Sequence, residues 1–296
     1  MLLSEIKDTI VKKCLRDSEF DSVALLGLRR NESERHIAYI LSEGYLELAK
    51  KEEIECLIIP ECISDFVYNN YDGGICVADD PKTAMFQIHE EINKNKEYED
   101  TIIADSSLIP KSASIAEKGV IIGENTIIED NVVIQEGSEI GDNCLIMAGS
   151  VIGTPAFYYY GDNENRKMVF SSGKVEIGNN VIIHSNVSIC KGVIGGSTKV
   201  GNNSCLDSNT FLGHDVQIGE NVIVAASSSF GGWVEIGNDC FFGVNSNVAP
   251  MVKVGSNVKS SIGSVITQDV KDNTHVSGNF AIEHNIFINN LKESLK

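Results

Sequence analysis

The sequence of 296 residues is poor in basic residues and has no long apolar segment. It holds 24 lysines and arginines against 42 aspartates and glutamates, which gives a formal net charge of −18. Without a basic stripe, binding to nucleic acid or to acidic membranes is disfavoured. No segment approaches the roughly 20 apolar residues of a membrane-spanning helix. The N-terminal MLLSEIKDTI carries acidic residues early and lacks the apolar core of a signal peptide. These absences predict a cytoplasmic protein.

The cysteines lack the spacing of a metal or redox site. There are eight of them, scattered along the chain, and none forms a CxxC pair. The pattern therefore predicts no bound metal and no redox motif. Cys144 and Cys240 occupy a small, inward position of the repeat described next, so we expect core thiols in a reducing compartment.

A six-residue repeat runs through more than half of the chain. Counting by six from Ile194 gives eleven apolar residues: Ile194, Val200, Leu206, Leu212, Ile218, Val224, Phe230, Ile236, Phe242, Val248 and Val254. Two earlier runs keep the same step: Ile128, Ile134, Ile140, Ile146 and Ile152, then Ile177, Ile183 and Ile189. The residue after each apolar position is usually Gly, Ala or Asp.

A period of six predicts a β-helix. It fits neither the 3.6-residue period of a helix nor the two-residue period of an alternating strand. One inward aliphatic per unit, followed by corners such as Gly178-Asn179-Asn180, describes a short flat strand and a turn that tolerates positive φ. Three units close a triangle, so one coil takes about 18 residues. An antiparallel sandwich is the alternative, but its spacings would drift. We therefore predict a mostly β fold, a parallel β-helix.

The ends of the chain lack the repeat and predict three parts. Residues 1–104 alternate short apolar runs with helical patterns, as at 81–94, where Pro81 suits a first helical turn. We predict a small N-terminal α/β domain there. Residues 105–278 form the β-helix, with an inserted loop at 154–174. Residues 279–296 form a short amphipathic C-terminal helix, from Ile282 to Leu295.

The insert at 154–174 carries four consecutive aromatic residues, from Phe157 to Tyr160. Long loops that project from a regular solenoid are usually functional. The aromatic side chains could pack on a neighbouring subunit or line a ligand cleft. The two interpretations are compatible where a site lies at a subunit junction. We predict that Phe157, Tyr158 and Tyr160 contact substrate.

His214 is the candidate general base. It stands at an outward position of its repeat, so we expect it on the surface of the coil, where a lone histidine is often merely solvated. One coil onward lies Gly232, whose N–H should stack near the imidazole. A base beside a free N–H is the pair that acyl transfer needs. Asp207 and Asp215 are both candidates for holding the histidine tautomer.

A zinc hydratase is the metal-dependent alternative on such a fold. It needs three converging histidines. Only His184 and His214 lie in the regular coils, so this alternative is disfavoured.

The stretch LDSNTFLGHDVQIGENVIVAA, residues 206–226, resembles a known family. It is similar to the UDP-3-O-(3-hydroxyacyl)glucosamine N-acyltransferases of lipid A biosynthesis, which belong to the left-handed β-helix hexapeptide acyltransferases. The resemblance covers nearly the whole chain. It implies a left-handed helix, a catalytic base at His214, an oxyanion donor at Gly232, and a homotrimer with active sites between subunits.

The N-terminal domain extends this resemblance. The family holds uracil between two aromatic residues with a polar residue midway, and HIAYILSEGY supplies Tyr39, Ser42 and Tyr45. Serine replaces the usual asparagine. Since stacking tolerates different bases, uridine is implied and thymidine stays open. From the residues alone, buried rings at a strand edge are the favoured explanation of the two tyrosines, and the resemblance reverses that preference.

Two departures from the family leave the substrate open. Met251 replaces a second functional histidine, and the tail is less basic, with Lys292 and Lys296 against Glu283 and Glu293. We predict an acyltransferase that uses a nucleotide-linked amino sugar and an acyl thioester, carried either by the phosphopantetheine of an acyl carrier protein or by coenzyme A, with no other cofactor. The alternatives are an acetyl-CoA-dependent N-acetyltransferase of a surface-polysaccharide sugar and a non-catalytic sugar-nucleotide scaffold.

Overall fold

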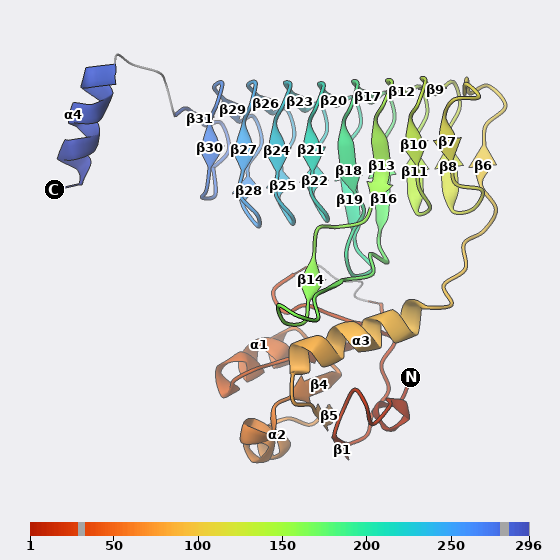
Figure 1. Ribbon diagram of the computed structural model, residues 1–296, viewed down its shortest axis with the longest axis vertical. Helices are drawn as coiled ribbons and strands as arrows, with labels where there is room; N and C mark the ends of the chain where they lie inside the picture. The colour runs from red at the N-terminus through yellow and green to blue at the C-terminus, as the bar shows by residue number, and fades with distance from the viewer. Residues whose placement is uncertain (29–32, 279–283, 296) are drawn as a thin grey trace.

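The computed structural model describes residues 1–28, 33–278 and 284–295 (Figure 1). A long β-helix occupies one half of the molecule, the N-terminal domain lies against its side, and a separate helix follows its last coil (Figure 1). The predicted fold class is confirmed: three parallel sheets of hexapeptide repeats, an N-terminal α/β domain and a C-terminal helix.

The β-helix has three parallel sheets, each named here after one of its strands. The β21 sheet contains β7 (Ser114–Ile115), β10 (Val133–Ile134), β13 (Val151–Thr154), β18 (Ser188–Cys190), β21 (Phe211–Leu212), β24 (Ser229–Phe230), β27 (Asn247–Val248) and β30 (Val265–Ile266). The β22 sheet contains β6 (Ile102–Ile103), β8 (Val120–Ile122), β11 (Ser138–Ile140), β16 (Lys174–Ile177), β19 (Ser197–Val200), β22 (Gln217–Ile218), β25 (Glu235–Ile236) and β28 (Lys253–Val254). The β23 sheet contains β9 (Ile127–Ile128), β12 (Leu145–Ile146), β17 (Ile182–Ile183), β20 (Cys205–Leu206), β23 (Ile223–Val224), β26 (Phe241–Phe242), β29 (Lys259–Ser260) and β31 (His275–Val276).

The apolar repeat positions form the core of the helix. Except for Ile194, all eleven positions counted from the sequence are buried. Phe230 and Phe242 meet inside it with ring centroids 5.1 Å apart, and the thiols of Cys144 and Cys240 are buried there too. Each fully buried side chain of this kind contributes about 2 kcal/mol. A single coil cannot bury this surface alone, so stacking stabilises every coil.

Asparagine builds the corners, as the sequence predicted. Residues such as Asn203, Asn221 and Asn257 take positive φ of 55–59°. Their side chains bond from coil to coil, with Asn203 Nδ2 donating to Asn221 Oδ1 at 3.2 Å across 18 residues. Asparagine adopts this left-handed conformation more readily than most residues, and its side chain also forms the hydrogen bonds that link one coil to the next.

Two coils are longer than the rest. The insert at 154–174 forms an antiparallel hairpin of β14 (Tyr159–Tyr160) and β15 (Lys167–Met168). The second departure, Lys191 to Gly196, was not predicted, and it raises the spacing between neighbouring coils there to 23 residues. Ile194 was predicted to be an inward repeat position, which is wrong. Because β18 ends at Cys190 and β19 begins at Ser197, Ile194 lies outside the coil and packs against the N-terminal domain.

The N-terminal domain is a five-stranded sheet with helices on both faces. Strands β2 (Ser22–Val23), β3 (His36–Tyr39), β4 (Cys56–Ile59) and β5 (Gly74–Val77) are parallel, and β1 (Lys13–Arg16) runs antiparallel beside β5. The helices are η1 (Leu3–Glu5), η2 (Glu43–Tyr45), α1 (Leu46–Lys51), η3 (Glu61–Ile63), α2 (Ser64–Asn70) and α3 (Pro81–Asn93). Helix α3 covers one face, and α1 and α2 cover the other. Pro81 begins α3 as predicted, and Asp80 caps it by accepting from the Thr83 N–H.

The β-helix begins at its first paired strand. Strand β6 already pairs with β8, so the first coil begins just before residue 105. Helix α4 (His284–Ser294) is the C-terminal helix; Ile286 and Leu291 are exposed on it, and Leu295 is exposed just beyond it. The predicted positions Ile282, Glu283 and Lys296 lie outside the described residues. Within the described ranges, no helix combines the length and apolarity that crossing a membrane requires.

Helix α3 docks on the insert of the β-helix. Phe86 stacks on Tyr160 with ring centroids 5.5 Å apart, and the Tyr160 hydroxyl donates to Glu90 Oε1 at 2.8 Å. His89 places Nε2 3.0 Å from the carbonyl oxygen of Phe170. These contacts join the two domains through the insert.

We expect this junction to weaken in acid. Burial lowers the pKa of His89 below the ordinary value of 6.5. Between that lowered pKa and 6.5 the unfolded chain binds the proton better, so the free energy of unfolding should fall as pH drops. The melting temperature of wild type should therefore drop more than that of His89→Gln between about pH 7 and about pH 5.5. An equal drop in both proteins would contradict this assignment.

Candidate catalytic site on the β-helix

His214 lies in the corner that follows β21 and is almost covered. Only 8% of the residue is exposed, so the predicted surface position is wrong. The reason is a pair of aromatic neighbours. Trp233, from the next coil, and Tyr158, from the insert, place their ring centroids 4.3 Å and 5.6 Å from that of the imidazole. The insert therefore closes over a residue that a plain coil would expose.

Asp215 fixes the orientation of the imidazole. Its Oδ2 lies 3.1 Å from His214 Nδ1 and also accepts from the Val193 N–H at 3.0 Å. A carboxylate can only accept, so Nδ1 carries a proton, and in the neutral imidazole Nε2 is then the nitrogen with the free lone pair. Asp207, the other candidate, lies in a different corner, with its Oδ1 3.8 Å from His184 Nδ1.

Gly232 lies directly against the reactive edge of the imidazole. A methyl group on its Cα would come within 2.5 Å of His214 Nε2. Any larger residue would therefore displace the ring. The absence of a side chain leaves Nε2 facing the backbone of the next coil.

The Gly232 N–H has no hydrogen-bond partner within the described part of the chain. In the corner that follows the strands of the β22 sheet, most of the equivalent N–H groups are capped by a side chain of the following coil. In the corner after β22 and β25, the N–H groups of Glu220 and Asn238 donate to Asn238 Oδ1 at 2.9 Å and to Ser256 Oγ at 3.1 Å. The residue one coil beyond Gly232 is Pro250, which has no side-chain acceptor. An uncapped donor thus lies beside Nε2.

A column of unusual residues runs along the same corner. Asp215, Trp233 and Met251 follow one another at one-coil intervals and take φ of 60°, 59° and 66°. Asparagine dominates the other corners, because large side chains pay a steric cost in this conformation. Strain of this kind persists at functional sites, where a side chain is needed in a fixed place.

A cavity of about 400 Å³ opens between this column and the N-terminal domain. The β-helix lines it with Asp215, Gln217, Trp233, Glu235, Met251 and Lys253, and the N-terminal domain with Gly27, Leu28 and Glu52. Among these described residues, the Lys253 ammonium lies 3.4 Å from Glu235 Oε1, and the Asp215 carboxylate faces the cavity beside the imidazole.

The residues predicted to bind the nucleotide are only partly brought together. Tyr39 ends β3 and lies near Tyr158 in the apolar cluster between the domains. Burial raises the pKa of both hydroxyls, and the charge of Asp80 adds to the effect at Tyr39. Ser42 and Tyr45 lie at the exposed 3₁₀ turn that follows. The carboxyl ends of parallel strands, where Tyr39 stands, are the usual ligand edge of such a sheet.

The three aromatic residues predicted from the insert point to different surroundings. Tyr158 covers His214, Tyr160 packs on α3, and Phe157 is largely exposed. Trp233 and Val193, which contact His214 and Asp215, were not predicted as site residues. The single tryptophan at a corner position, where asparagine is usual, was the available signal for the first. The break in the repeat around Gly192, Gly195 and Gly196 was the signal for the second.

Comparison with known proteins agrees with the coil geometry. The chain matches the model for the bacterial transferase hexapeptide (six repeats) at residues 119–154 and 197–232, and the model for the hexapeptide repeat of succinyl-transferase at 234–268. These three segments of the β-helix are therefore similar to transferase hexapeptide repeats. The matched residues make up less than half of the chain. No curated protein is similar enough to match it.

Solved structures give distant likenesses. UDP-N-acetylglucosamine O-acyltransferase (LpxA) from Moraxella catarrhalis is 24% identical over 64% of this chain and 77% of its own, with a TM-score of 0.40. LpxA from Acinetobacter baumannii is 26% identical over the same shares, with a TM-score of 0.43. PerB from Caulobacter crescentus, solved with CoA and GDP-perosamine, is 14% identical over 83% of this chain and 82% of its own, with a TM-score of 0.22.

The strained column allows a test of stability. Met251 is exposed with φ of 66°. Met251→Asn should therefore stabilise the fold by about 1 kcal/mol, because asparagine adopts the left-handed region more easily. Differential scanning fluorimetry should detect a higher melting temperature. Met168→Asn is the matched control, since Met168 is exposed in strand β15 without positive φ. A lower or unchanged melting temperature for Met251→Asn would show that the column is not strained.

Proposed function

We propose that the protein transfers an acyl group from a thioester to the amino group of a nucleotide-linked sugar. One observation carries the proposal. His214 presents an unprotonated Nε2 beside the uncapped N–H of Gly232, while Asp215 holds the opposite edge of the ring. A base and an oxyanion donor in one corner are the groups that acyl transfer requires.

The reaction follows from these two groups. His214 Nε2 accepts a proton from the amine as its nitrogen attacks the thioester carbonyl. The carbonyl oxygen gains negative charge and receives the Gly232 N–H, a contact worth about 3–4 kcal/mol in comparable sites. The tetrahedral intermediate then releases the thiolate, which takes the proton back from the imidazolium. The products are an amide and a free thiol, and Asp215 stabilises the imidazolium without accepting its proton.

Asp215 supports an amine as the acceptor, because its carboxylate lines the cavity beside His214. An amino sugar arrives mostly as an ammonium ion, which a carboxylate attracts, and it gives up one proton to water before its nitrogen attacks. The cavity also adjoins the N-terminal domain, where Tyr39 stands at the carboxyl edge of the sheet. We propose that the nucleotide binds there, as a uridine or thymidine diphosphate.

Coenzyme A is our first candidate for the thioester carrier. The chain carries a net charge of −18, so an acidic carrier protein would gain little electrostatic attraction from it. A hydroxyacyl carrier protein is the second candidate, because the resemblance to the lipid A N-acyltransferases extends over the insert and the N-terminal domain.

We further propose a homotrimer that packs through the outer face of the β23 sheet. Its outward residues from β9 to β26 are apolar: Ile127, Leu145, Ile182, Cys205, Ile223 and Phe241. The outer face of the β22 sheet carries mostly charged residues: Glu139, Glu176, Lys199, Gln217, Glu235 and Lys253. A continuous apolar face of this kind marks a protein interface.

Ile223 tests the trimer. Ile223→Asp buries a charge in the proposed interface, so size-exclusion chromatography with light scattering should give a monomer where wild type gives a trimer. Ile121→Asp is the matched control, since Ile121 lies on the β22 sheet and is 45% exposed against 48% for Ile223. A monomeric wild type, or equal masses for both variants, would refute the proposed face.

His214 tests the reaction. Release of thiol should be measured with UDP- and dTDP-linked amino sugars, each paired with acetyl-CoA and with a hydroxyacyl carrier protein. His214→Gln should lower kcat by about 100-fold or more, because the general base is lost. His184→Gln is the control, since His184 lies in another corner and is partly exposed. A His214→Gln rate within a few-fold of wild type would reject the mechanism, and turnover with one carrier alone would identify the donor.

A further inference from the structure

We infer that the loop from Lys191 to Gly196, called the cradle loop here, is a positioning device for the catalytic dyad. It holds the Asp215 carboxylate so that His214 keeps its proton on Nδ1. This inference rests on the proposed function, because it assigns a role within that site. The residues of the loop are positioning residues, since none of them touches the reacting atoms.

The cradle loop surrounds the carboxylate closely. The Val193 N–H donates to Asp215 Oδ2 at 3.0 Å, the same oxygen that receives His214 Nδ1. On the other side, a methyl group on Gly196 would lie 2.3 Å from Asp215 Oδ1, and one on Gly192 would lie 2.8 Å from it. The two glycines therefore leave the space that the carboxylate fills. Both oxygens are confined, and a carboxylate with one position gives the imidazole one tautomer.

Hydrogen bonds to the preceding segment fix the cradle loop. Ser172 donates its N–H to the Val193 carbonyl at 3.0 Å, and its Oγ accepts from the Gly195 N–H at 2.9 Å. The Lys174 N–H donates to the Gly196 carbonyl at 2.9 Å. The loop is thus held along its length by the strand that returns from the insert.

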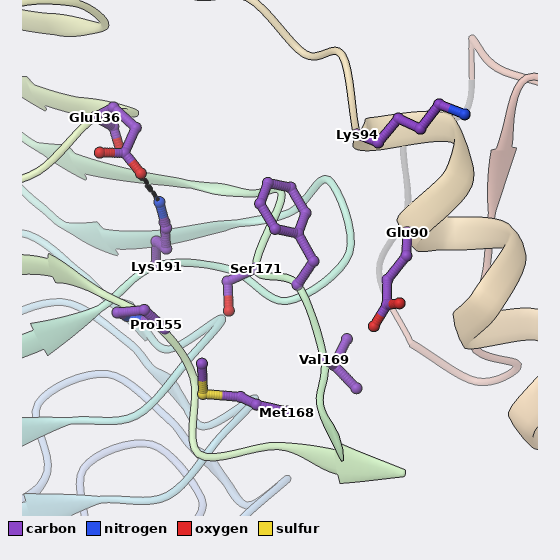
Figure 2. Close-up of a pocket in the computed structure, with 9 residues that line it drawn as sticks. Glu90, Lys94, Glu136, Pro155, Met168, Val169, Ser171 and Lys191 are labelled. Carbon is purple, nitrogen blue, oxygen red and sulfur yellow. Dashed lines mark hydrogen bonds and ion pairs between the residues drawn. The ribbon is translucent and has the colours of Figure 1, made fainter. Parts of the chain in front are cut away.

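Lys191 anchors the start of the cradle loop. Its side chain is only 4% exposed, and its Nζ lies 2.9 Å from Glu136 Oε1. Figure 2 shows this ion pair at one side of a cavity of about 430 Å³ between the insert and α3. A buried ammonium is costly without its partner, so the pair holds the chain at this point.

The cradle loop also contacts the N-terminal domain. Val193 is fully buried, and Ile194 packs beside it, in the same apolar cluster as Phe86 of α3. The residue whose N–H holds Asp215 is therefore packed by the domain proposed to bind the nucleotide. This arrangement explains why the repeat is interrupted at this coil. A regular corner would have neither the backbone donor nor the contact.

The test is Gly196→Ala compared with Gly278→Ala. A methyl group at Gly278 meets nothing within 4 Å, so Gly278→Ala should change neither the tautomer of His214 nor kcat. The ¹⁵N shifts of labelled histidine report which ring nitrogen carries the proton. For Gly196→Ala we expect His214 to shift toward a mixture of tautomers. We expect kcat to fall about 100-fold with KM nearly unchanged, since the substrate contacts remain.

Lys191→Met provides a second variant should Gly196→Ala fold poorly. It removes the anchor and leaves Glu136, which is partly exposed, in place. The same change of tautomer is expected, with a fall in kcat of about tenfold. A wild-type tautomer in both variants would overturn the inference. A changed tautomer with undiminished turnover would support the positioning role of the cradle loop and would reject His214 as the base. Because the tautomer is read without substrate, an inactive wild type would reject only the proposed function.

Discussion

The stacking of one coil on the next, at an interval of 18 residues in the regular coils, governs this molecule. It places residues that are far apart in sequence into straight columns. His214, Gly232 and Pro250 share one column, and Asp215, Trp233 and Met251 share the next. A base therefore meets a backbone N–H without any special loop. Each coil contributes one residue to a column. A residue in an outer column can therefore be replaced without altering the core.

The uncapped N–H of Gly232 is a consequence of this arrangement. In the corner that follows the β22 sheet, side-chain oxygens of the next coil accept from most of the corner N–H groups and stabilise the helix. At Gly232 the donor is exposed because two consecutive residues of the column, Gly232 and Pro250, lack a side-chain acceptor. Glycine leaves room for the imidazole, and proline supplies no acceptor. Each missing acceptor costs a hydrogen bond of about 1 kcal/mol. The site thus gives up some of these hydrogen bonds, and the strained Trp233 and Met251 add to that cost.

The sequence was sufficient for features that depend on the repeat. The apolar step of six located the core, the asparagines located the corners, and the one-coil interval paired His214 with Gly232. It was insufficient where the chain leaves the coil. Counting by six placed Ile194 in the core because Ile194 stands six residues before Val200. The cradle loop instead packs against the N-terminal domain. The burial of His214 was missed for the same reason, since Tyr158 reaches it by tertiary packing that no periodicity encodes.

The two interruptions of the repeat meet at one place. The insert brings Tyr158 over His214, and the cradle loop brings Val193 to Asp215. Both also contact α3 through the cluster around Phe86. A regular β-helix can supply a base and a donor, but it cannot seal them or link them to a second domain, because its coils contact only their neighbours. The irregular segments supply those two properties, so in the proposed site the departures from the repeat enclose His214 and Asp215, while the repeat places the imidazole beside Gly232.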